Sequence, residues 1–233
     1  MQHLTLRDVH RRIAEMAREL HDECGDTPDT VLARLTDCAV SAIPGADYAA
    51  ITMSEGRGRI QTLVATHPYP RLLDQIQTRH KEGPYVEAAS DADLVRVDDL
   101  ASDLRWPAYG ADAVTHTPIR SLMAFKLFTT RQLLGTLNVY ADQPHAFDSS
   151  AEEIGALFAT HAALAWDNIR RERQFRRALE TRDCIGQAKG MIMERYGLDA
   201  DAAFKLLTKM SQNSNTPVAA LARELIAINH PCV

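Results

Sequence analysis

Residues 120–142 read RSLMAFKLFTTRQLLGTLNVYAD, and they predict the sheet around which the chain folds. The stretch holds two runs, 120–130 and 132–142, that are rich in apolar, aromatic and β-branched residues. A tight turn is expected near Thr130 and Arg131. Two such runs on either side of a short turn predict an antiparallel hairpin.

A second hairpin is predicted earlier in the chain, where ADYAAITM (46–53) and RIQTLVAT (59–66) flank the turn residues EGRG. A helix is expected over 70–80 and another after Pro107, with a short strand inside 94–100. Pairs of strands separated by helices favour an α+β fold with an antiparallel sheet over an alternating βαβ fold.

A long helix is predicted after His145. Ser149 and Glu152 fit a capping box, and apolar residues then recur at spacings of three and four through 196 without a proline. One nearly continuous helix of about 40–48 residues would be roughly 60–70 Å long. Such a helix favours a partner helix, most simply the same helix of a second chain. The alternative is a break near 170–180 that folds the helix back.

The ends of the chain are also predicted to be helical. The N-terminal segment 5–24 is amphipathic and could join the long helix in a dimer interface. A helix should open at Asp199 and reach about Met210, SQNSNTP should form a loop, and Pro217 should start a last helix. Residues 182–230 are therefore expected to form a small three-helix module.

The bulk composition excludes several classes of protein. The chain has 233 residues, 45% hydrophobic and 24% charged, which is typical of a globular protein. It has neither a run of about 18 apolar residues nor a secretory h-region at its start, so no membrane partner is expected. Its four scattered cysteines favour reduced thiols and a cytoplasmic location.

The formal charge of −5 is unevenly distributed. Residues 1–169 carry 15 Lys and Arg against 24 Asp and Glu, whereas residues 170–210 carry 10 against 6. The first segment therefore has a net charge of −9 and the second of +4. A basic segment on an acidic body suggests that the two parts do different work, and that the basic part could meet a polyanion.

The stretch RDCIGQAKGMIMERYG (182–197) places polar residues around an apolar stripe of the long helix. Gly190 inside a helix costs about 1 kcal/mol relative to Ala, so it suggests the close approach of another backbone. That backbone could belong to the protein's own core or to a nucleic acid. Lysine and arginine can contact phosphates, and glutamine can read a base edge. The spacing alone leaves both interpretations open.

Residues 177–226 resemble the ANTAR domain, the RNA-binding output module of bacterial transcription antiterminators. The resemblance is carried by Ile185–Gly186, Ala188–Lys189–Gly190, Ile192–Met193, Ala203–Phe204, Leu207, Ser211 and Asn215. It implies a dimer that binds tandem RNA stem-loops in transcript leaders and stabilises them against an overlapping terminator. The RNA-binding residues expected on this basis, or from charge and polarity beside the motif, are Arg182, Gln187, Ala188, Lys189, Gly190, Arg195, Lys205, Lys209, Ser211 and Asn213.

Residues 27–165 resemble a GAF domain of the kind fused to ANTAR in actinobacterial proteins. The carrying segments are EGP (82–84), VDDL (97–100), RWPAY (105–109), IRSLMAFKLF (119–128), LLGTLNVYADQPHAF (133–147) and FATHAALAW (158–166). The resemblance implies a cavity for an unknown small-molecule ligand. Tyr85 follows EGP, at the position where related GAF domains are expected to carry a cysteine. The tyrosine argues against a thiol sensor or a covalent chromophore at this position.

Four residues are the candidates for contacting such a ligand: Tyr85, Arg105, Trp106 and Arg120. The arginines could hold an acidic ligand, although salt bridges are a competing role for them. No catalytic set, phosphate loop or metal-ligand spacing is present, so neither an enzyme, a cofactor nor a metal site is predicted.

These expectations combine into one hypothesis and two rivals. The predicted order is an N-terminal dimerisation helix (1–26), a GAF sensor (27–165), a coiled-coil-like connecting helix (166–181) and an ANTAR domain (182–230). The hypothesis is a homodimer in which the sensor's signal reaches the RNA-binding domain through the long helix. The first rival is a signalling protein-interaction module with a degenerate GAF pocket. The second is a ligand-binding module without output.

Overall fold

The structure is a computed structural model that describes residues 28–56, 59–88, 92–129 and 132–229. The helix expected over 5–24, and with it the proposed dimerisation segment 1–26, lies outside the described residues. The chain divides into two compact units at Ile169 and Arg170. Within the described residues, no helix is both long and apolar enough to cross a membrane.

The first unit is built on one antiparallel sheet of five strands in the order β2-β1-β5-β4-β3. The two predicted hairpins are confirmed as β1–β2 and β4–β5, and the short strand as β3. The bounds are β1 Tyr48–Gly56, β2 Arg59–Ala65, β3 Leu94–Val97, β4 Ser121–Thr129 and β5 Gln132–Ala141. Successive side chains along each strand point to opposite faces of the sheet, so each strand contributes residues to both faces.

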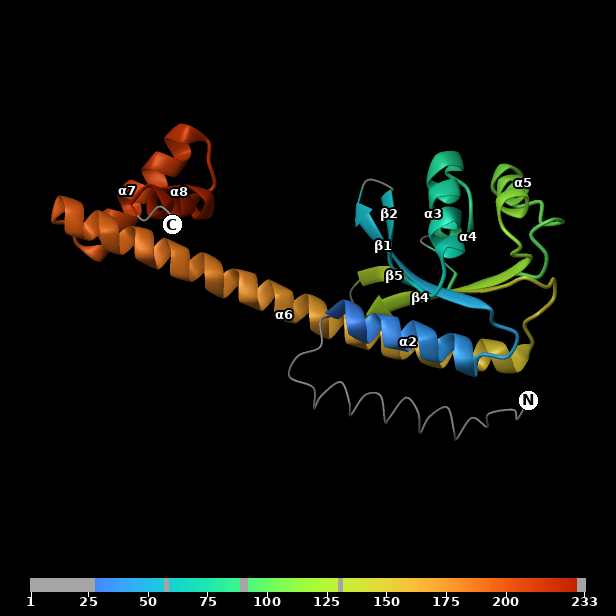
Figure 1. The fold of residues 1–233 in the computed structure, drawn as a ribbon. Helices are drawn as coiled ribbons and strands as arrows, with labels where there is room; N and C mark the ends of the chain where they lie inside the picture. Colours follow the sequence, from blue (N-terminus) through green and yellow to red (C-terminus); the bar gives the residue numbers. More distant parts are fainter. Residues whose placement is uncertain (1–27, 57–58, 89–91, 130–131, 230–233) are drawn as a thin grey trace. The chain divides into compact units, whose positions relative to one another are not determined.

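Helices cover both faces of this sheet, as Figure 1 shows. One face packs on α2 (Pro28–Ala42) and on the first part of α6 (Ser149–Tyr196). The other face packs on α3 (Pro68–His80) and α5 (Pro107–His116), with α4 (Pro84–Ala88) beside them. The α+β prediction is confirmed, while the short α4 was not anticipated.

The two faces of the sheet differ in polarity. Leu137 and Val139 of β5 point into the apolar core beneath α2 and α6. The alternate residues of the same strand, Thr136, Asn138 and Tyr140, are also buried, and they belong to the face beneath α3 and α5. The buried polar side chains of β5 therefore lie on the side of the sheet beneath α3 and α5.

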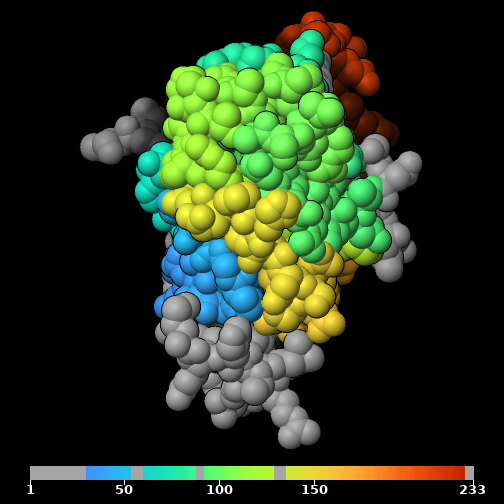
Figure 2. Space-filling view, turned by 90° about the vertical axis from the view of Figure 1, so that its right-hand side faces the viewer, coloured from blue at the N-terminus to red at the C-terminus, as the bar shows by residue number. Residues whose placement is uncertain are grey.

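The start of α6 is tied to the sheet edge. Asp148 caps the helix, since its Oδ1 accepts the backbone N–H of Ala151 at 2.9 Å and the hydroxyl of Ser150 at 2.7 Å. The capping box predicted for Ser149 and Glu152 is wrong, because Glu152 pairs with Arg96 of β3 instead. Figure 2 shows the segment that contains β3, in green, beside the start of α6, in yellow, on one face.

The long helix is confirmed as one element of 48 residues, and the predicted alternative of a break near 170–180 is wrong. All ten side chains from 171 to 180 are exposed to solvent. They include the apolar side chains of Phe175, 65% exposed, and Leu179, 41% exposed. This part of α6 therefore has no partner of its own among the described residues that would cover its apolar groups.

The second unit packs the end of α6 against α7 (Ala200–Ser214) and α8 (Val218–Asn229). Asp199 caps α7 as expected, accepting the N–H of Ala202 at 2.8 Å. The helix runs four residues beyond the predicted end at Met210, because Asn215 adopts φ 51° and provides the left-handed C-cap. The loop expected over 211–217 is therefore helical through Ser214.

Candidate functional site

The core of the second unit decides which side of α6 faces outward. Ala188 and Ile192 are buried against Ala203, Leu207 and Ala222. At 100° per residue, positions 182, 186 and 190 lie on the opposite side of the helix from Ala188. Ala188 was predicted to contact RNA, but the structure places it in the core, where it positions the helix.

Two glycines occupy the outward side of α6. A Cβ atom built on Gly186 or on Gly190 meets no described atom within 4 Å. Close packing inside the chain, one of the two explanations for Gly190, is therefore wrong for the described residues. Each glycine lowers helix stability by about 1 kcal/mol relative to Ala, and no close contact within the described residues requires a glycine at either position. Together they leave an exposed strip of backbone along the helix.

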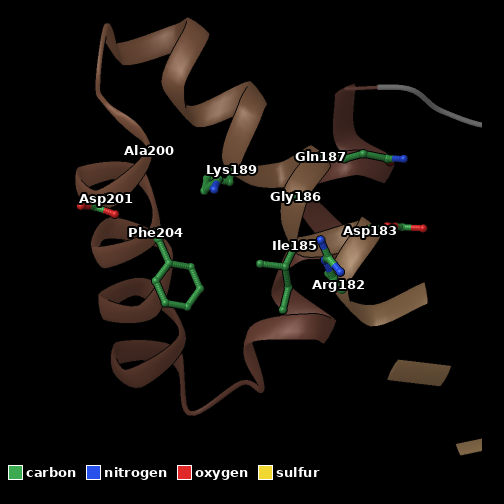
Figure 3. A pocket seen from close by; sticks show the side chains of 9 residues that line it. All are labelled: Arg182, Asp183, Ile185, Gly186, Gln187, Lys189, Ala200, Asp201 and Phe204. Carbon is green, nitrogen blue, oxygen red and sulfur yellow. The ribbon is translucent and has the colours of Figure 1, made fainter. Parts of the chain in front are cut away.

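A groove of about 590 Å³ lies between this part of α6 and the start of α7 (Figure 3). Phe204 of α7 and Ile185 of α6 face one another across it, and Lys189 lies beside them. Gln187 and Asp183 point to the other side of α6. The lining residues are Arg182, Asp183, Ile185, Gly186, Gln187, Lys189, Ala200, Asp201 and Phe204.

A second groove, of about 460 Å³, lies on the neighbouring side of α6, towards Ile226 of α8. Gly190, Glu194 and Met191 line it together with Gln187, which borders both grooves. Gln187 is exposed and carries both a donor and an acceptor. The Gln187 amide can therefore hydrogen-bond to a polar partner that lies along the exposed backbone at Gly186 and Gly190.

Apart from the buried Ala188, the predicted RNA-binding residues divide into three groups. Arg182, Gln187, Lys189 and Gly190 lie together along the grooves. Exposed positions outside both groove linings hold Arg195, Lys205, Lys209 and Asn213. Ser211 is buried, and its hydroxyl donates to the carbonyl oxygen of Thr216 at 2.5 Å. Ser211 therefore anchors the α7–α8 connection and does not reach the surface.

The first unit contains a second site candidate, a buried polar cluster centred on Asp74 of α3. Asp74 is 4% exposed. Its Oδ2 accepts the hydroxyls of Thr52 at 2.7 Å and Thr62 at 2.5 Å, and its Oδ1 accepts the amide of Gln77 at 3.1 Å. Burial raises the pKa of Asp74 from 3.8 to about 6, although these hydrogen bonds and Arg71 act in the opposite direction.

The cluster continues across the sheet and toward α4. Asn138 donates to the hydroxyl of Thr52 at 3.1 Å, which joins β5 to β1. Gln77 accepts the backbone N–H of Tyr85 at 2.9 Å. Gly83 is required beside it, because a Cβ there would lie 2.5 Å from Gln77 Cγ and the glycine has φ +131°. The EGP segment thus closes over the polar cluster.

Two further hydroxyls belong to this interior. Tyr109 is fully buried, and its hydroxyl has no hydrogen-bond partner among the described residues. The hydroxyl of Thr136 is in the same situation. Burial raises the pKa of Tyr109, and the nearby Asp74 carboxylate adds to this. Unsatisfied buried hydroxyls cost on the order of 1–3 kcal/mol each, so they are places where an added polar group would be stabilised.

The four predicted ligand-binding residues are only partly brought together. Tyr85 and Trp106 are buried, and the Arg105 guanidinium stacks 4.4 Å from the centre of the Trp106 ring. Arg105 is paired with Asp103 at 2.6 Å and with Glu87 at 3.3 Å, so an acidic ligand would have to displace a carboxylate. Arg120 donates to the carbonyl oxygens of residues 117 and 119.

Sequence reasoning missed Asp74 and the threonines that surround it. A signal was available, because Asp74 and Gln77 lie on the same helix face as the buried Leu73 and Ile76. Within the described segments, no group of three or more His, Cys, Asp or Glu side chains could hold a metal ion.

A five-stranded antiparallel sheet that carries a buried polar cluster is joined through a long helix to a three-helix module, so the chain combines two domains of different architecture. The chain belongs to the GAF domain family, whose sequence profile matches residues 25–167. The ANTAR domain profile matches residues 173–226. This order, a GAF sensor domain followed by a domain of the RNA-binding antiterminator family, supports the assignment of the protein as a signal-responsive regulator.

Solved structures share the fold of the first unit. A domain assigned to a two-component sensor histidine kinase from Sinorhizobium meliloti 1021 is 19% identical, with a TM-score of 0.54, covering 65% of this chain and 99% of its own. The GAF domain of an Acinetobacter phosphoenolpyruvate-protein phosphotransferase is 16% identical, with a TM-score of 0.56 and coverages of 73% and 97%.

An enzyme is also among these neighbours. Free methionine-R-sulfoxide reductase from Neisseria meningitidis, solved with its substrate, is 14% identical, with a TM-score of 0.51 and coverages of 71% and 92%. At these identities the likeness concerns the fold alone. No curated protein matches the chain. The GAF–ANTAR order points to a regulatory role.

Proposed function

We propose that this protein is an RNA-binding transcription antitermination regulator, acting in the cytoplasm, whose GAF domain senses a small molecule. The observation that carries the proposal is the outward face of α6 in the ANTAR domain. Arg182, Gln187 and Lys189 border its grooves, and none of these three side chains has a hydrogen bond or ion pair with any residue that the structure describes. They are available to a partner that also approaches the bare backbone at Gly186 and Gly190.

The charge of this part of the chain favours a polyanion as that partner. Residues 170–210 carry ten Lys and Arg against six Asp and Glu. Cations that contact phosphates supply salt-dependent affinity, and an amide at Gln187 can bond to a base edge. The domain's resemblance to RNA-binding antiterminators selects RNA, and paired stem-loops are the proposed form.

A homodimer is proposed because α6 exposes apolar groups at helical spacing. Leu164 is exposed, as are Phe175 and Leu179, and all three lie within about 60° of one line along the helix. A matching stripe on a second copy would cover them. Phe175→Glu should lower the mass measured by light scattering toward the monomer. Gln174→Glu, on a neighbouring position that points away from the stripe, should leave the mass unchanged.

The small-molecule signal is proposed to act at the Asp74 cluster. The unpartnered hydroxyls of Tyr109 and Thr136 favour a ligand with hydrogen-bonding groups. Binding there would strain or relieve the contacts of the sheet with α6, and α6 continues into the ANTAR domain. Any change in the spacing of two ANTAR domains would alter their joint affinity for paired stem-loops.

The proposal is tested by titrating the full chain with an RNA that carries two tandem hexaloop stem-loops, at two salt concentrations. A single stem-loop is the control. Salt-sensitive binding that is much tighter for the tandem RNA would support a dimeric RNA reader. Equal affinity for both RNAs would contradict the paired-loop proposal.

A charge reversal distinguishes groove binding from nonspecific attraction. Lys189→Glu should weaken RNA binding and lower the slope of log K against log salt by about one. Arg223→Glu makes the same change of charge at an exposed position of α8 that lines neither groove. It should have a much smaller effect. If wild-type protein bound no RNA at either salt concentration, the protein-interaction rival with a degenerate GAF pocket would replace this proposal.

A further inference from the structure

An aromatic side chain in the ANTAR domain lies outside the core that the other residues of its helix build. Phe204 on α7 is 46% exposed, although its neighbours Ala203 and Leu207 are completely buried. Exposing part of a phenyl ring leaves apolar area in water that a smaller or polar residue would not. The packing of this unit therefore does not account for a ring at position 204.

The surroundings of Phe204 combine one apolar surface with cations. The ring faces Ile185 across the groove between α6 and α7, and Lys189 lies at the edge of this apolar surface (Figure 3). Arg182 lines the same groove one helical turn before Ile185 and Gly186. Gly186 contributes no side chain, which keeps this part of the groove open to a volume of about 590 Å³.

The charged groups of the groove are uncommitted. Arg182, Lys189 and Asp201 make no ion pair or side-chain hydrogen bond with any residue that the structure describes. Exposed charged side chains elsewhere in the chain do pair, as Arg176 and Glu172 do at 2.6 Å. Two free cations beside a flat aromatic surface match the two parts of a nucleotide, which are a planar base and an anionic phosphate.

We propose that Phe204 is a stacking platform for one unpaired RNA base, with Lys189 and Arg182 holding the phosphates on either side of it. The proposal rests on the RNA-binding function above and adds to it a contact residue and a mode of recognition. Single-stranded loops are recognised mainly through unstacked bases that lie on aromatic side chains. Because every base has a π-face, stacking on Phe204 would contribute affinity without distinguishing between bases. Gln187, which points to the other side of α6, would contribute base selectivity through hydrogen bonds.

The size of the apolar surface argues against a protein in this groove. A stable protein interface buries about 1,200–2,000 Å² in total and centres on several apolar anchors. The groove offers two large apolar side chains, Phe204 and Ile185, among five charged or polar ones. That area suits one base and falls well short of a protein partner.

The first test compares variants of the full chain in titrations with the tandem stem-loop RNA. Phe204→Leu keeps an apolar side chain of good helix propensity but removes the π-face, and it should weaken binding by about 5- to 100-fold. Phe204→Trp should bind as tightly as wild type or more tightly. The salt slope should stay the same in both variants because no phosphate contact is lost. Ile228→Ala, at a 74% exposed apolar position of α8, is the matched control and should bind normally.

The second test locates the base. Each loop nucleotide is replaced in turn by an abasic site, and each RNA is titrated with wild type and with Phe204→Leu. At the stacked position the abasic site and the substitution remove the same interaction, so the combined loss should equal either single loss. At every other position the two losses should multiply.

The outcomes separate this inference from the function on which it rests. If wild type binds the tandem RNA and Phe204→Leu binds equally well, the stacking platform is refuted and the RNA-binding function stands. Losses that multiply at every loop position also refute it. If wild type binds no RNA, both fail. If Phe204→Leu instead lowers the mass of the dimer with normal RNA affinity, the ring belongs to an interface between copies, and the inference is overturned.

Discussion

Gly155 of α6 lies directly against the ring of Phe125 in β4. A Cβ built at residue 155 would lie 2.2 Å from Cζ and 2.5 Å from Cε2 of that ring. Phe125 is itself buried between the sheet and the helix, with 3% of its surface exposed. The first part of α6 is therefore held against the sensor sheet at a distance that only glycine permits.

Gly155→Ala should destabilise the GAF domain by about 1–3 kcal/mol, because an added methyl group forces the helix or the ring to move. Chemical unfolding followed by circular dichroism would measure this loss. Phe125→Leu in the same chain should recover part of it. If the two losses simply added, the close contact at this position would not be the cause.

Gly186 and Gly190 should behave in the opposite way, since a Cβ there meets nothing. Alanine at either position should stabilise the three-helix unit by up to about 1 kcal/mol, seen as slower hydrogen exchange in α7 and α8. The same substitution should weaken RNA binding several-fold, because a methyl group would stand between the backbone and the RNA. Unchanged affinity would show that the RNA does not approach these glycines.

Asp74 should make the stability of the GAF domain depend on pH. Its pKa is about 6 when folded and near 3.8 when unfolded, so the native state binds more protons between these values. The free energy of unfolding should therefore rise as the pH falls from about 6 toward 4, by on the order of 3 kcal/mol from this group.

Denaturant titrations of wild type and Asp74→Asn at several pH values would measure this contribution as the difference between the two proteins. Thr62→Val removes a hydrogen bond that favours the ionised carboxyl, so the transition should move to higher pH. A difference between wild type and Asp74→Asn that did not change with pH would contradict the raised pKa.

The continuity of α6 should matter for communication between the domains. Ala178 is exposed in the stretch between them, and proline there removes a helix hydrogen bond and kinks the helix at a cost of about 3 kcal/mol. Ala178→Pro should leave the GAF domain folded but reduce dimerisation and tandem-RNA affinity. Ala178→Ser is the control for a small exposed change. Normal mass and normal RNA binding in the proline variant would refute transmission through the long helix.

Local features of the sequence predicted the secondary structure well. Both hairpins, the short β3, the long α6 and the C-terminal helices follow from periodicity and turn residues, which act over a few positions. The ends of elements were less predictable. Asp148 competes successfully with Ser149 for the cap of α6, and a left-handed Asn215 lets α7 continue to Ser214. Such choices depend on side-chain contacts that periodicity does not describe.

The sequence by itself determined the order of the domains, the antiparallel sheet and the placement of Gln187 and Lys189 on the motif helix, because these depend on neighbours in the chain. Only the tertiary structure decided which polar residues are buried together. It brings Thr52 and Thr62 to Asp74 across 22 and 12 residues of sequence. It also decided that Gly155 is a packing requirement while Gly186 and Gly190 are open, since the environment of a glycine is set by whatever other segment the fold places against it.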